Sequence, residues 1–439
     1  MMFRKETEFQ ETEIGKFPKD WKVVKLKDIL ILLRNGLTLR QRKDGKGYPV
    51  TRIETISEEK IDPTKLGYVT GLSEKDIEEY RLIEGDILFS HINSLDHIGK
   101  TAIYEGEPEL LLHGMNLLLL RPNKNIVHPR FLLYLLRLFR ARKIFSTMAK
   151  KAVNQASINQ TELGNLKIPL PPLEEQKRIA DILSMIDSGI GTVDRAIAKL
   201  ERMKRVLSNE LLTGRIRVRE ENGKLTFYKE TEFQDTEIGK IPKDWKTEKL
   251  SSLATIIMGQ SPPSTTYNKE GEGLPFIQGK MEFGKMYPSP TTYTSRPLKI
   301  AEKGDVLMSV RAPVGDVNIA PYKLCIGRGL AAIRFNPKMA NNLFYFYYLQ
   351  SIKSRLESLG KGSTFKAITK KDLEELRIVY LPLNEQKGIA NILLTIDNAI
   401  ELYYREKERL SRLRRGLMSV LLTGRVRVIG DVKNVGVVT

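Results

Sequence analysis

The chain has few of the residues that build several common kinds of site. Its 439 residues include a single cysteine, Cys325, which excludes a framework of intrachain disulfides. The four histidines crowd into the first half of the chain without the Cys/His spacing typical of zinc ligands. No run of about 18 uncharged apolar residues occurs, and the N-terminal MMFRKETEFQ lacks the apolar core of a secretory signal. We therefore expect a cytoplasmic protein without a metal site or a membrane span.

Negative charge is also scarce relative to positive charge. Lys and Arg number 72 against 53 Asp and Glu, so the formal net charge is +19. Such an excess favours a polyanionic partner, nucleic acid first and a membrane surface second, because binding to phosphates releases their counterions. Hydrophobic residues make up 41% of the chain, enough for real cores, and the length suits about two to four domains.

Two long helices are the clearest signal in the sequence. The segment from Leu173 to Gly214 places apolar residues at a spacing that puts a stripe on one helix face. The segment recurs from Leu383 to Gly424 without an insertion and is identical at nearly half of its positions. The residues expected to pair the helices are Ile179, Ile186, Ile190, Leu200 and Leu207 in the first copy, and Ile389, Ile396, Ile400, Leu410 and Leu417 in the second, whose stripe also includes Tyr403.

Both copies carry start and stop signals as well as the stripe. Pro172 and Pro382 suit a first helical turn, and Gly214 and Gly424 suit a left-handed C-cap. A helix of this length would measure roughly 60 Å at 1.5 Å per residue, and its stripe needs a partner. The other copy is the obvious partner. The alternative is that both are ordinary core helices of a helical domain.

The repeat extends beyond the helices. ETEFQETEIGKFPKDWK from Glu6 returns as ETEFQDTEIGKIPKDWK from Glu230, so the chain is a tandem of two units. Each of these lead segments contains a tryptophan, Trp21 or Trp245, which we expect at the edge of a core. Each unit then continues with a variable region and ends on a long helix.

The two variable regions match in frame. The matching pieces are Gly36-Leu37-Thr38 with Gly259-Gln260-Ser261, PVTRI from Pro49 with PFIQG from Pro275, GDILFS from Gly85 with GDVLMS from Gly304, and HGMNLLLLRPN from His113 with IGRGLAAIRFNP from Ile326. Such short runs between turn residues predict strands, and helices are expected from Phe131 and Leu343. The pattern predicts two mixed α/β globules.

A catalytic site in each unit would need the same reactive residues at matched positions. Asp86 and Asp305 match, but each follows a glycine in a turn that leads into a strand, and a turn role is the simpler interpretation. SLDHIGKT from Ser94 lacks the first glycine of a phosphate-binding loop. The chain also lacks a glycine-rich cofactor turn and an Asn/Asp-Pro-Pro-aromatic motif for methylating an amino base. These observations argue against a standalone methyltransferase.

Polar differences between the copies favour two readers of different DNA sequence. Arg52 stands where Gln278 stands, and Met115 stands where Arg328 stands. Arg pairs with guanine and Gln or Asn with adenine in the major groove, so such exchanges alter the base that is read without altering the frame. Surface drift between duplicated units is the alternative at any single position. The candidate DNA-binding residues are Arg40, Gln41, Arg42, Arg52, His91, Asn93, Gln260, Ser261, Gln278, Lys280, Arg311, Arg328, Lys361 and Lys366.

Several motifs together carry a family resemblance: LPPLEEQKRIADIL from Leu170, YLPLNEQKGIANIL from Tyr380, and the paired LLTGRIRV and LLTGRVRV. With them the chain resembles the DNA specificity subunit of a type I restriction-modification system. The resemblance implies two target recognition domains, each reading half of a bipartite double-stranded DNA sequence, and two antiparallel helices that space them. It implies no catalytic activity and no cofactor on this chain. The implied partners are two modification subunits that bind S-adenosylmethionine and restriction subunits that cut DNA, so S-adenosylmethionine, ATP and Mg are expected only there.

The predicted fold is therefore mixed α/β (α+β), with two globular recognition domains, a coiled-coil spacer of two long antiparallel helices and an internal pseudo-twofold repeat. The boundaries are 1–157 for the first lead segment and recognition domain, 158–215 for the first spacer helix, 216–246 for the connector and second lead segment, 247–367 for the second recognition domain, 368–425 for the second spacer helix and 426–439 for a tail expected to be frayed. Two other classes remain as alternatives: a DNA-modifying enzyme with a fused reader, and a coiled-coil scaffold that does not bind nucleic acid.

Overall fold

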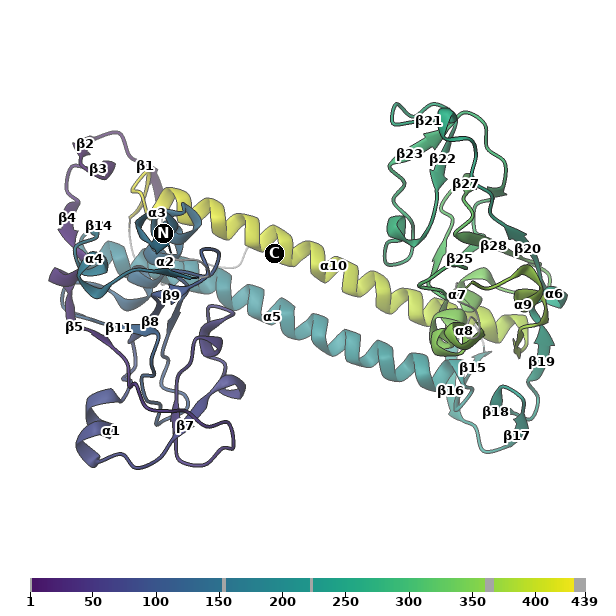
Figure 1. Cartoon of the computed structure of the whole chain (residues 1–439), viewed down its shortest axis with the longest axis horizontal. Coiled ribbons are helices and arrows are strands. Elements are labelled where there is room, and N and C mark those ends of the chain that lie inside the picture. The colour runs from purple at the N-terminus through teal and green to yellow at the C-terminus, as the bar shows by residue number, and fades with distance from the viewer. Residues whose placement is uncertain (1, 152–154, 222–223, 360–366, 430–439) are drawn as a thin grey trace. The chain divides into compact units, whose positions relative to one another are not determined.

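The computed structural model describes residues 2–151, 155–221, 224–359 and 367–429 (Figure 1). The chain divides into two compact units. Unit 1 takes the residues up to Asp194 together with those from Arg405 onward, and unit 2 takes Arg195–Tyr404. Each unit consequently contains part of both long helices, although each sequence repeat holds only one of them.

Unit 1 is built around a four-stranded antiparallel sheet in the order β10–β8–β11–β5. These strands are β5 (Leu30–Asn35), β8 (Ile87–Ser90), β10 (Thr101–Ile103) and β11 (Leu117–Pro122). Smaller sheets pair β1 (Met2–Lys5) with β30 (Val426–Ile429), β2 (Phe9–Thr12) with β3 (Gly15–Pro18), β4 (Lys22–Lys25) with β14 (Lys167–Leu170), β6 (Tyr48–Val50) with β7 (Gly67–Val69), and β13 (Ala156–Ser157) with both β12 (Lys150–Lys151) and β9 (Ile92–Asn93). The helices are α1 (Glu74–Tyr80), α2 (Pro129–Ala141), α3 (Ile144–Met148), α4 (Gln160–Gly164) and the first part of α5 (Leu173–Leu212).

Unit 2 repeats this frame with a sheet in the order β26–β25–β28–β20. Its strands are β20 (Ala254–Met258), β25 (Val306–Ser309), β26 (Val317–Ile319) and β28 (Leu330–Phe335). A second, mixed sheet has the order β21 (Tyr267–Asn268), β23 (Thr292–Thr294), β22 (Leu274–Ile277), β27 (Leu324–Ile326) and β24 (Ile300–Ala301), and strand pairs join β15 (Ile216–Glu221) to β16 (Lys224–Lys229), β17 (Phe233–Thr236) to β18 (Gly239–Pro242), and β19 (Lys246–Lys249) to β29 (Arg377–Tyr380). The helices are α6 (Leu250–Leu253), α7 (Asn342–Ser351), α8 (Lys353–Leu359), α9 (Lys370–Glu375) and the first part of α10 (Leu383–Leu421). The prediction of two mixed α/β globules is confirmed.

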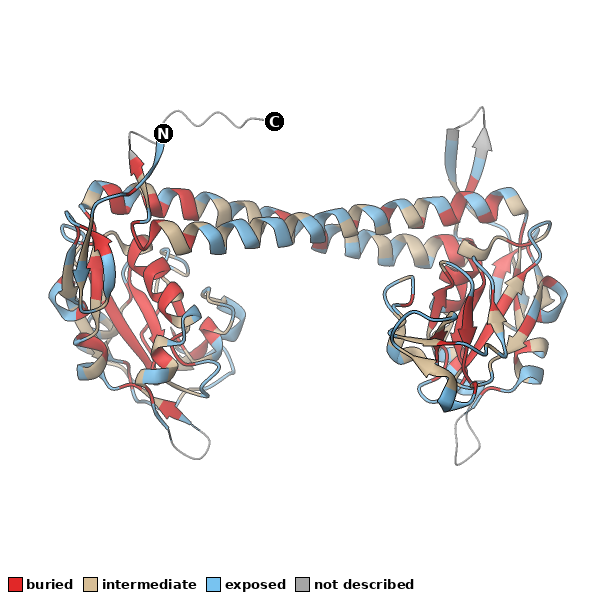
Figure 2. Ribbon diagram, turned by 90° about the horizontal axis from the view of Figure 1, so that it is seen from above, coloured by how far each residue is buried: buried red, intermediate tan, exposed pale blue. Residues whose placement is uncertain are grey.

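The central strands are apolar on both faces because both faces are covered. In β8, Ile87 and Phe89 pack in the core that includes α2, whereas Leu88 between them packs in a second, smaller core. Unit 2 divides β25 in the same way, with Val306 and Met308 on one side and Leu307 on the other. This alternation follows from the two-residue period of a strand. Figure 2 shows buried strands inside each unit.

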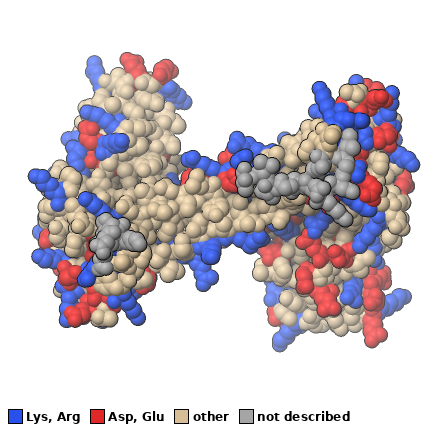
Figure 3. All heavy atoms as spheres, turned by 180° about the vertical axis from the view of Figure 1, so that it is seen from behind, with Lys and Arg blue, Asp and Glu red and all other residues tan. Residues whose placement is uncertain are grey.

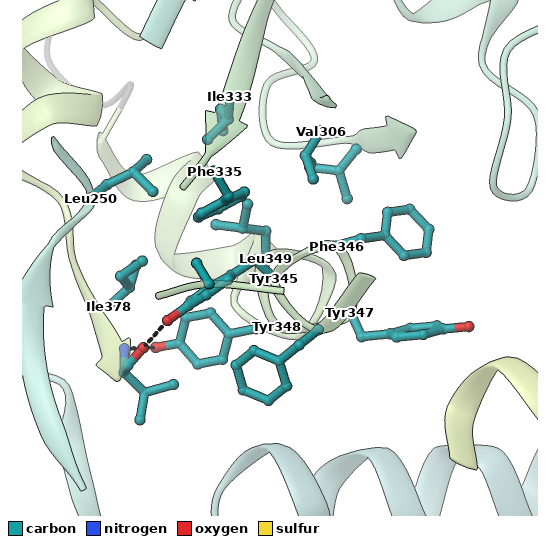
Figure 4. Packing of buried hydrophobic residues seen from close by; sticks show 14 of the residues in the cluster. Leu250, Val306, Ile333, Phe335, Tyr345, Phe346, Tyr347, Tyr348, Leu349 and Ile378 are labelled. Atoms are coloured by element: carbon teal, nitrogen blue, oxygen red, sulfur yellow. Dashed lines mark hydrogen bonds between the residues drawn. The ribbon is translucent and has the colours of Figure 1, made fainter. Parts of the chain in front are cut away.

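Helix α7 supplies much of the aromatic core of unit 2 (Figure 4). The ring of Tyr345 stacks on Phe335 with centroids 4.5 Å apart. Its hydroxyl donates a hydrogen bond to the Val379 carbonyl at 3.0 Å, and the Tyr348 hydroxyl accepts one from the Val379 amide at 3.3 Å (Figure 4). Both buried hydroxyls therefore bind the backbone of β29 and hold α7 against the strand that leads into α10.

The two long helices begin and end where the sequence signals predict. Helix α5 begins directly after Pro172 and α10 directly after Pro382. Gly214 and Gly424 follow the helix ends with φ of +70° and +68°. A Cβ at either glycine would also lie 2.4 Å from a proline ring, Pro242 or Pro18. Glycine is therefore required both by the backbone conformation and by the close approach.

The helices lie antiparallel within each unit (Figures 1 and 2). In unit 1, Asp187 pairs with Arg414 at 2.8 Å and Asp194 with Lys407 at 2.6 Å, so the numbers rise on α5 as they fall on α10. Unit 2 has the same sense, since Glu201 is bound by Tyr404 at 2.9 Å and Lys204 by Asp397 at 2.6 Å.

The predicted stripe largely faces inward. Ile179, Ile389, Ile396 and Ile400 are buried, and half-buried are Ile186, Ile190, Leu200, Leu207, Leu410 and Leu417. Tyr403 is 40% exposed, and its inclusion in the stripe is wrong. Steps of three and four residues drift around a long helix, so one straight stripe cannot stay on the seam over its whole length.

One arginine holds the start of each long helix: Arg217 is buried and Arg427 is half-buried. Arg427 in β30 binds Glu175 of α5 through two hydrogen bonds of 2.7 Å. Arg217 in β15 binds Glu385 of α10 at 2.7 and 2.9 Å. Arg427 thus follows α10 in the sequence but binds the start of α5, and Arg217 follows α5 but binds the start of α10. The prediction of a frayed tail is wrong for Val426–Ile429, because this segment is strand β30 and carries Arg427; residues 430–439 lie outside the described part of the chain.

The Glu and Gln of the EQK motif make the same contacts in both copies. The buried Trp21 and Trp245 donate their indole N–H to Glu175 and Glu385, each at 3.2 Å. Gln176 accepts a hydrogen bond from the His128 amide at 2.8 Å, and the matched Gln386 accepts one from the Asn341 amide at 2.8 Å. These amides lie at the N-termini of α2 and α7, so each glutamine attaches a globule to its long helix.

Candidate nucleic-acid interface

Three loops converge at one place in each unit, which we call the three-loop junction. In unit 1 it consists of residues 36–42, 49–54 and 113–116, and in unit 2 of residues 259–262, 275–280 and 326–329. In unit 1 the Leu37 amide donates to the His113 carbonyl at 2.9 Å, and the Gly114 amide donates to the Thr51 hydroxyl at 2.9 Å. The backbone thus joins segments that are far apart in the sequence.

Unit 2 builds its junction from the matched segments. The Gln260 amide donates to the Ile326 carbonyl at 3.0 Å, and the Gly327 amide donates to the Ile277 carbonyl at 2.7 Å. A Cβ at Gly259 would lie 2.1 Å from the Gly327 carbonyl oxygen, just as one at Gly36 would lie 2.0 Å from that of Gly114. Glycine at these positions lets two backbones touch, so the predicted correspondence of the loops is confirmed in space.

The junction of unit 1 surrounds a cleft of about 660 Å³ that is lined in part by Arg40, Gln41, Arg52 and Met115. Arg52 donates to the Gln41 carbonyl oxygen at 3.2 Å and to Glu54 at 3.2 Å. The guanidinium is therefore held in place beside the amide that it contacts. Arg40 is exposed, as is Arg42, which pairs with Asp44 at 2.6 Å.

The junction of unit 2 presents different side chains on the same frame. Gln260, Gln278 and Arg328 are exposed, and the half-buried Ser261 accepts a hydrogen bond from the Arg328 amide at 3.3 Å. Lys280 is also half-buried and pairs with Asp316 at 2.8 Å, a carboxylate that it shares with Lys353. The junction of unit 2 therefore exposes carboxamide and guanidinium groups to solvent. At the matched positions, the junction of unit 1 has Arg52 in place of Gln278 and the apolar Met115 in place of Arg328.

The other candidates that the structure describes lie outside the three-loop junctions. His91 is only 7% exposed, and burial lowers its pKa to about 4, so the ring is neutral at pH 7. A buried neutral ring is a poor phosphate contact. The Asn93 amide donates to the Ser90 hydroxyl at 3.1 Å. Arg311 is exposed beside the bridge that it forms with Ala367. Lys361 and Lys366 lie outside the described residues.

The sequence analysis missed an Arg–Asp ion pair that occurs in both units and stabilises the turn before a central strand. Arg121 donates two hydrogen bonds to the buried Asp86 at 2.9 and 2.8 Å, and Arg334 binds the matched Asp305 at 2.8 Å. The same aspartates accept the Ile83 and Glu302 amides at 2.9 Å, which confirms their turn role. The signal was available, because both arginines stand at matched positions of the two copies.

Positive charge extends from the globules onto the long helices. Figure 3 shows Lys and Arg side chains projecting from the helices on the face in view. Lys and Arg outnumber Asp and Glu in the second part of α5, from Arg195 to Leu212. Among the residues that the structure describes, no cluster of three or more His, Cys, Asp or Glu could hold a metal ion. Within the same residues no helix combines the length and apolarity that crossing a membrane requires.

Comparison with known proteins decides the family. The family model for the type I restriction modification DNA specificity domain matches residues 18–202 and 242–412. The chain belongs to this family. A relative from Methanocaldococcus jannaschii, provisionally named as the MjaX specificity subunit of a type I restriction enzyme, is 57% identical over 98% of this chain and 99% of its own length. The MjaVIII specificity subunit of the same organism is 27% identical over 98% of both chains.

Solved structures agree with this assignment. A chain from a structure of the assembly and conformational transition of a type I restriction-modification system is 28% identical, covers 93% of this chain and 99% of its own length, and superposes with a TM-score of 0.55. The S subunit from M. genitalium, at 16% identity, shares the fold with a TM-score of 0.61 over 91% of this chain and 96% of its own. The chain is a DNA specificity subunit without catalytic activity of its own. A DNA-modifying enzyme with a fused reader is not favoured.

Proposed function

We propose that each unit of this specificity subunit reads one half of a bipartite DNA sequence through its three-loop junction. The supporting observation is that one backbone frame, built twice, carries Arg52 and Met115 in unit 1 but Gln278 and Arg328 in unit 2. A guanidinium suits the acceptors of guanine, a carboxamide suits adenine, and an apolar side chain suits the methyl group of thymine. The two half-sites are therefore expected to differ in sequence.

The contacts outside the junction serve a different purpose in this proposal. Exposed cations such as Arg40 and Arg42, and those of the long helices, contact phosphates and hold the protein on the duplex without reading it. Because α-helices are stiff, α5 and α10 set the number of unread base pairs between the half-sites. Two modification subunits and the restriction subunits bind this chain and carry S-adenosylmethionine, ATP and Mg. The complex works in the cytoplasm, on genomic DNA.

The test changes the first recognition domain, either as a whole or at a single junction side chain. We would coexpress the chain with its modification and restriction partners and sequence the methylated adenines of the host genome. Exchanging residues 23–157 for the matching region of another specificity subunit should change only one half of the methylated sequence. Arg52→Gln should change the base preferred at one position of that same half, with a discrimination of about 1 to 3 kcal/mol.

The matched control is Arg42→Gln, which removes an exposed cation from the same surface. It should weaken methylation uniformly across sequences and leave the preferred bases unchanged. A change in both half-sites after the exchange of residues 23–157 would show that the units do not read independently. Purified chain that is not retained on DNA even at low salt would instead support a scaffold that does not bind nucleic acid, whereas a DNA-binding chain should be retained at low salt and released steeply as the salt concentration rises.

A further inference from the structure

Asp187 of α5 is contacted by three groups from two other elements of unit 1, α2 and α10. The Tyr134 hydroxyl of α2 donates a hydrogen bond to it at 2.9 Å. Arg414 of α10 donates another at 2.8 Å. Arg137 of α2 completes the group at 3.6 Å. One carboxylate therefore joins the recognition domain, the long helix that carries it and the opposite long helix.

Asp397 of α10 does the same in unit 2. The Tyr347 hydroxyl of α7 donates to Asp397 at 2.7 Å, and Lys204 of α5 pairs with it at 2.6 Å. The Lys204 ammonium also lies 5.4 Å from the centroid of the Tyr347 ring. Asp397, Tyr347 and Lys204 stand at the positions that match Asp187, Tyr134 and Arg414 in the other copy. The arrangement is therefore built twice with the roles of α5 and α10 exchanged.

These aspartates occupy places where an apolar residue would pack well. The side chains of Asp187 and Asp397 are only 23% and 25% exposed, at the level where α2 or α7 meets the two helices. A partly buried carboxylate is a poor source of stability, since its loss of hydration offsets most of what its partners contribute. A polar group in a helix seam, however, is satisfied in a single register, and this is the best attested use of such groups.

The hydrogen bonds of Asp187 allow little displacement of α2 or α10 along α5. A displacement by one residue along a helix moves a side chain by about 1.5 Å and turns it to another face. Hydrogen bonds near 2.8 Å are lost at such a shift. Tyr134 and Arg414 reach Asp187 from two different elements, so the carboxylate defines the height of α2 on α5 and the register of α10 against α5 at the same point.

In unit 1 the network continues toward the three-loop junction. Arg137 donates a hydrogen bond to the Glu59 carbonyl, and Arg140 binds the Glu59 carboxylate at 2.7 Å. Glu59 has a left-handed backbone with φ of +58°, a conformation that a non-glycine residue adopts only when its surroundings hold it. It lies a few residues after Arg52. The contacts of Asp187 are thus connected, through Arg137, to the segment that carries a candidate base reader.

Unit 2 lacks this continuation. Gln350 stands at the position of Arg137, and its neutral carboxamide cannot form an ion pair with Asp397. Lys353 binds Asp316 at 2.5 Å, and Asp316 binds Lys280 at 2.8 Å, but this second network does not include Asp397. The contacts of Asp187 therefore extend through Arg137 to Glu59, whereas Asp397 has no such connection through Gln350.

We propose that Asp187 and Asp397 are positioning residues that set the spacing of the two half-sites. Each fixes where one recognition domain stands on the helix pair, and Asp187 additionally supports the reading loop of unit 1. This inference rests on the proposed bipartite reading. It concerns neither base contact nor catalysis, because both aspartates lie on the long helices, away from the three-loop junctions.

The experiment measures spacer preference. The complex with the modification subunits would methylate synthetic duplexes that carry the native spacer, or a spacer one base pair longer or shorter. We expect Asp187→Asn and Asp397→Asn each to reduce the preference for the native spacer by about tenfold, which corresponds to ~1.4 kcal/mol. Asp187→Asn should also relax the base preference in the half-site of unit 1. Asp397→Asn should leave base preference unchanged in both half-sites.

Matched variants separate positioning from stability. Asp181→Asn changes an exposed aspartate of α5 to the residue that Asn391 provides in the other copy, and it should alter nothing. Tyr134→Phe and Tyr347→Phe remove one hydroxyl at constant packing, and each should widen the accepted spacers without unfolding the chain. Arg137→Gln makes unit 1 resemble unit 2, so it should relax the base preference and keep the spacer preference.

Three results would decide between the possibilities. Wider spacer tolerance at an unchanged melting temperature supports the inference. A lower melting temperature with the native spacer preference intact overturns it, because the aspartates would then only stabilise the fold. A complex with the unaltered chain that shows no bipartite target would refute the proposed function itself, and this control is measured first.

Discussion

Replacing Arg427 with methionine should destabilise unit 1 far more than the removal of an ordinary surface charge. The Arg427 side chain is 14% exposed and lies against the Trp21 ring at 5.9 Å. It donates five hydrogen bonds, to Glu175, Glu6 and Asp20. The hydrogen bonds that it donates to these carboxylates, to Glu175 above all, raise the pKa of Arg427, so the arginine remains charged at every accessible pH.

The magnitude follows from what the substitution leaves behind. Within the described residues, Glu175, which is 3% exposed, would keep only the Trp21 indole as a side-chain partner, and Glu6, at 4%, would keep two backbone amides. Leaving a buried charge uncompensated costs about 3 to 5 kcal/mol. At about 2 to 4 °C per kcal/mol for a unit of this size, the melting temperature of unit 1 should fall by roughly 6 to 20 °C.

Calorimetry with hydrogen exchange would measure the loss and locate it. Arg427→Met should increase exchange in β1, β30 and the start of α5, whereas Arg217→Met should do so in β15 and the start of α10. Arg425→Met is the control, since this exposed residue lies two positions away and its loss should stay within about 0.5 kcal/mol. An Arg427→Met chain that melts within a degree of the unaltered protein would refute this reasoning.

Three further results are expected from the same structure. Ile396→Asp and Ile400→Asp should each cost at least about 1.5 to 3 kcal/mol of lost burial, measured by denaturant unfolding, and more than Ile186→Asp, because the first two are buried and Ile186 is half-buried. Backbone amides, that of Glu8 first, and Arg427 lower the pKa of Glu6 from 4.5 to about 2. The contribution of Glu6 should therefore be complete above pH 4.5 and be lost as the pH falls toward 2, and Glu6→Gln should flatten the pH dependence of the melting temperature in that window; an unchanged slope would contradict the assignment. Binding of the chain or its complex to DNA should weaken steeply with salt, and Arg40→Ala should lower the slope of that dependence by about 1.

Local sequence was sufficient for the elements and for the pairing of the two copies. The starts at Pro172 and Pro382 and the left-handed Gly214 and Gly424 depend on each residue's own backbone preferences. The correspondence of the three loops could also be predicted, since it needed only the comparison of one half of the chain with the other. Matched glycines such as Gly36 and Gly259 indicated which loops correspond.

The tertiary structure decided which side chains are available and which distant segments meet. His91 and Lys280 sit in loops that the sequence marks as readers, but one is buried and the other is bound by Asp316. Arg427 reaches Glu6, which is 421 positions away in the chain, and thereby turns an apparent tail into a strand. Sequence patterns report backbone preferences and periodicity because these act over a few residues. Burial and ion pairing depend on contacts that exist only after each unit has closed around segments from both halves of the chain.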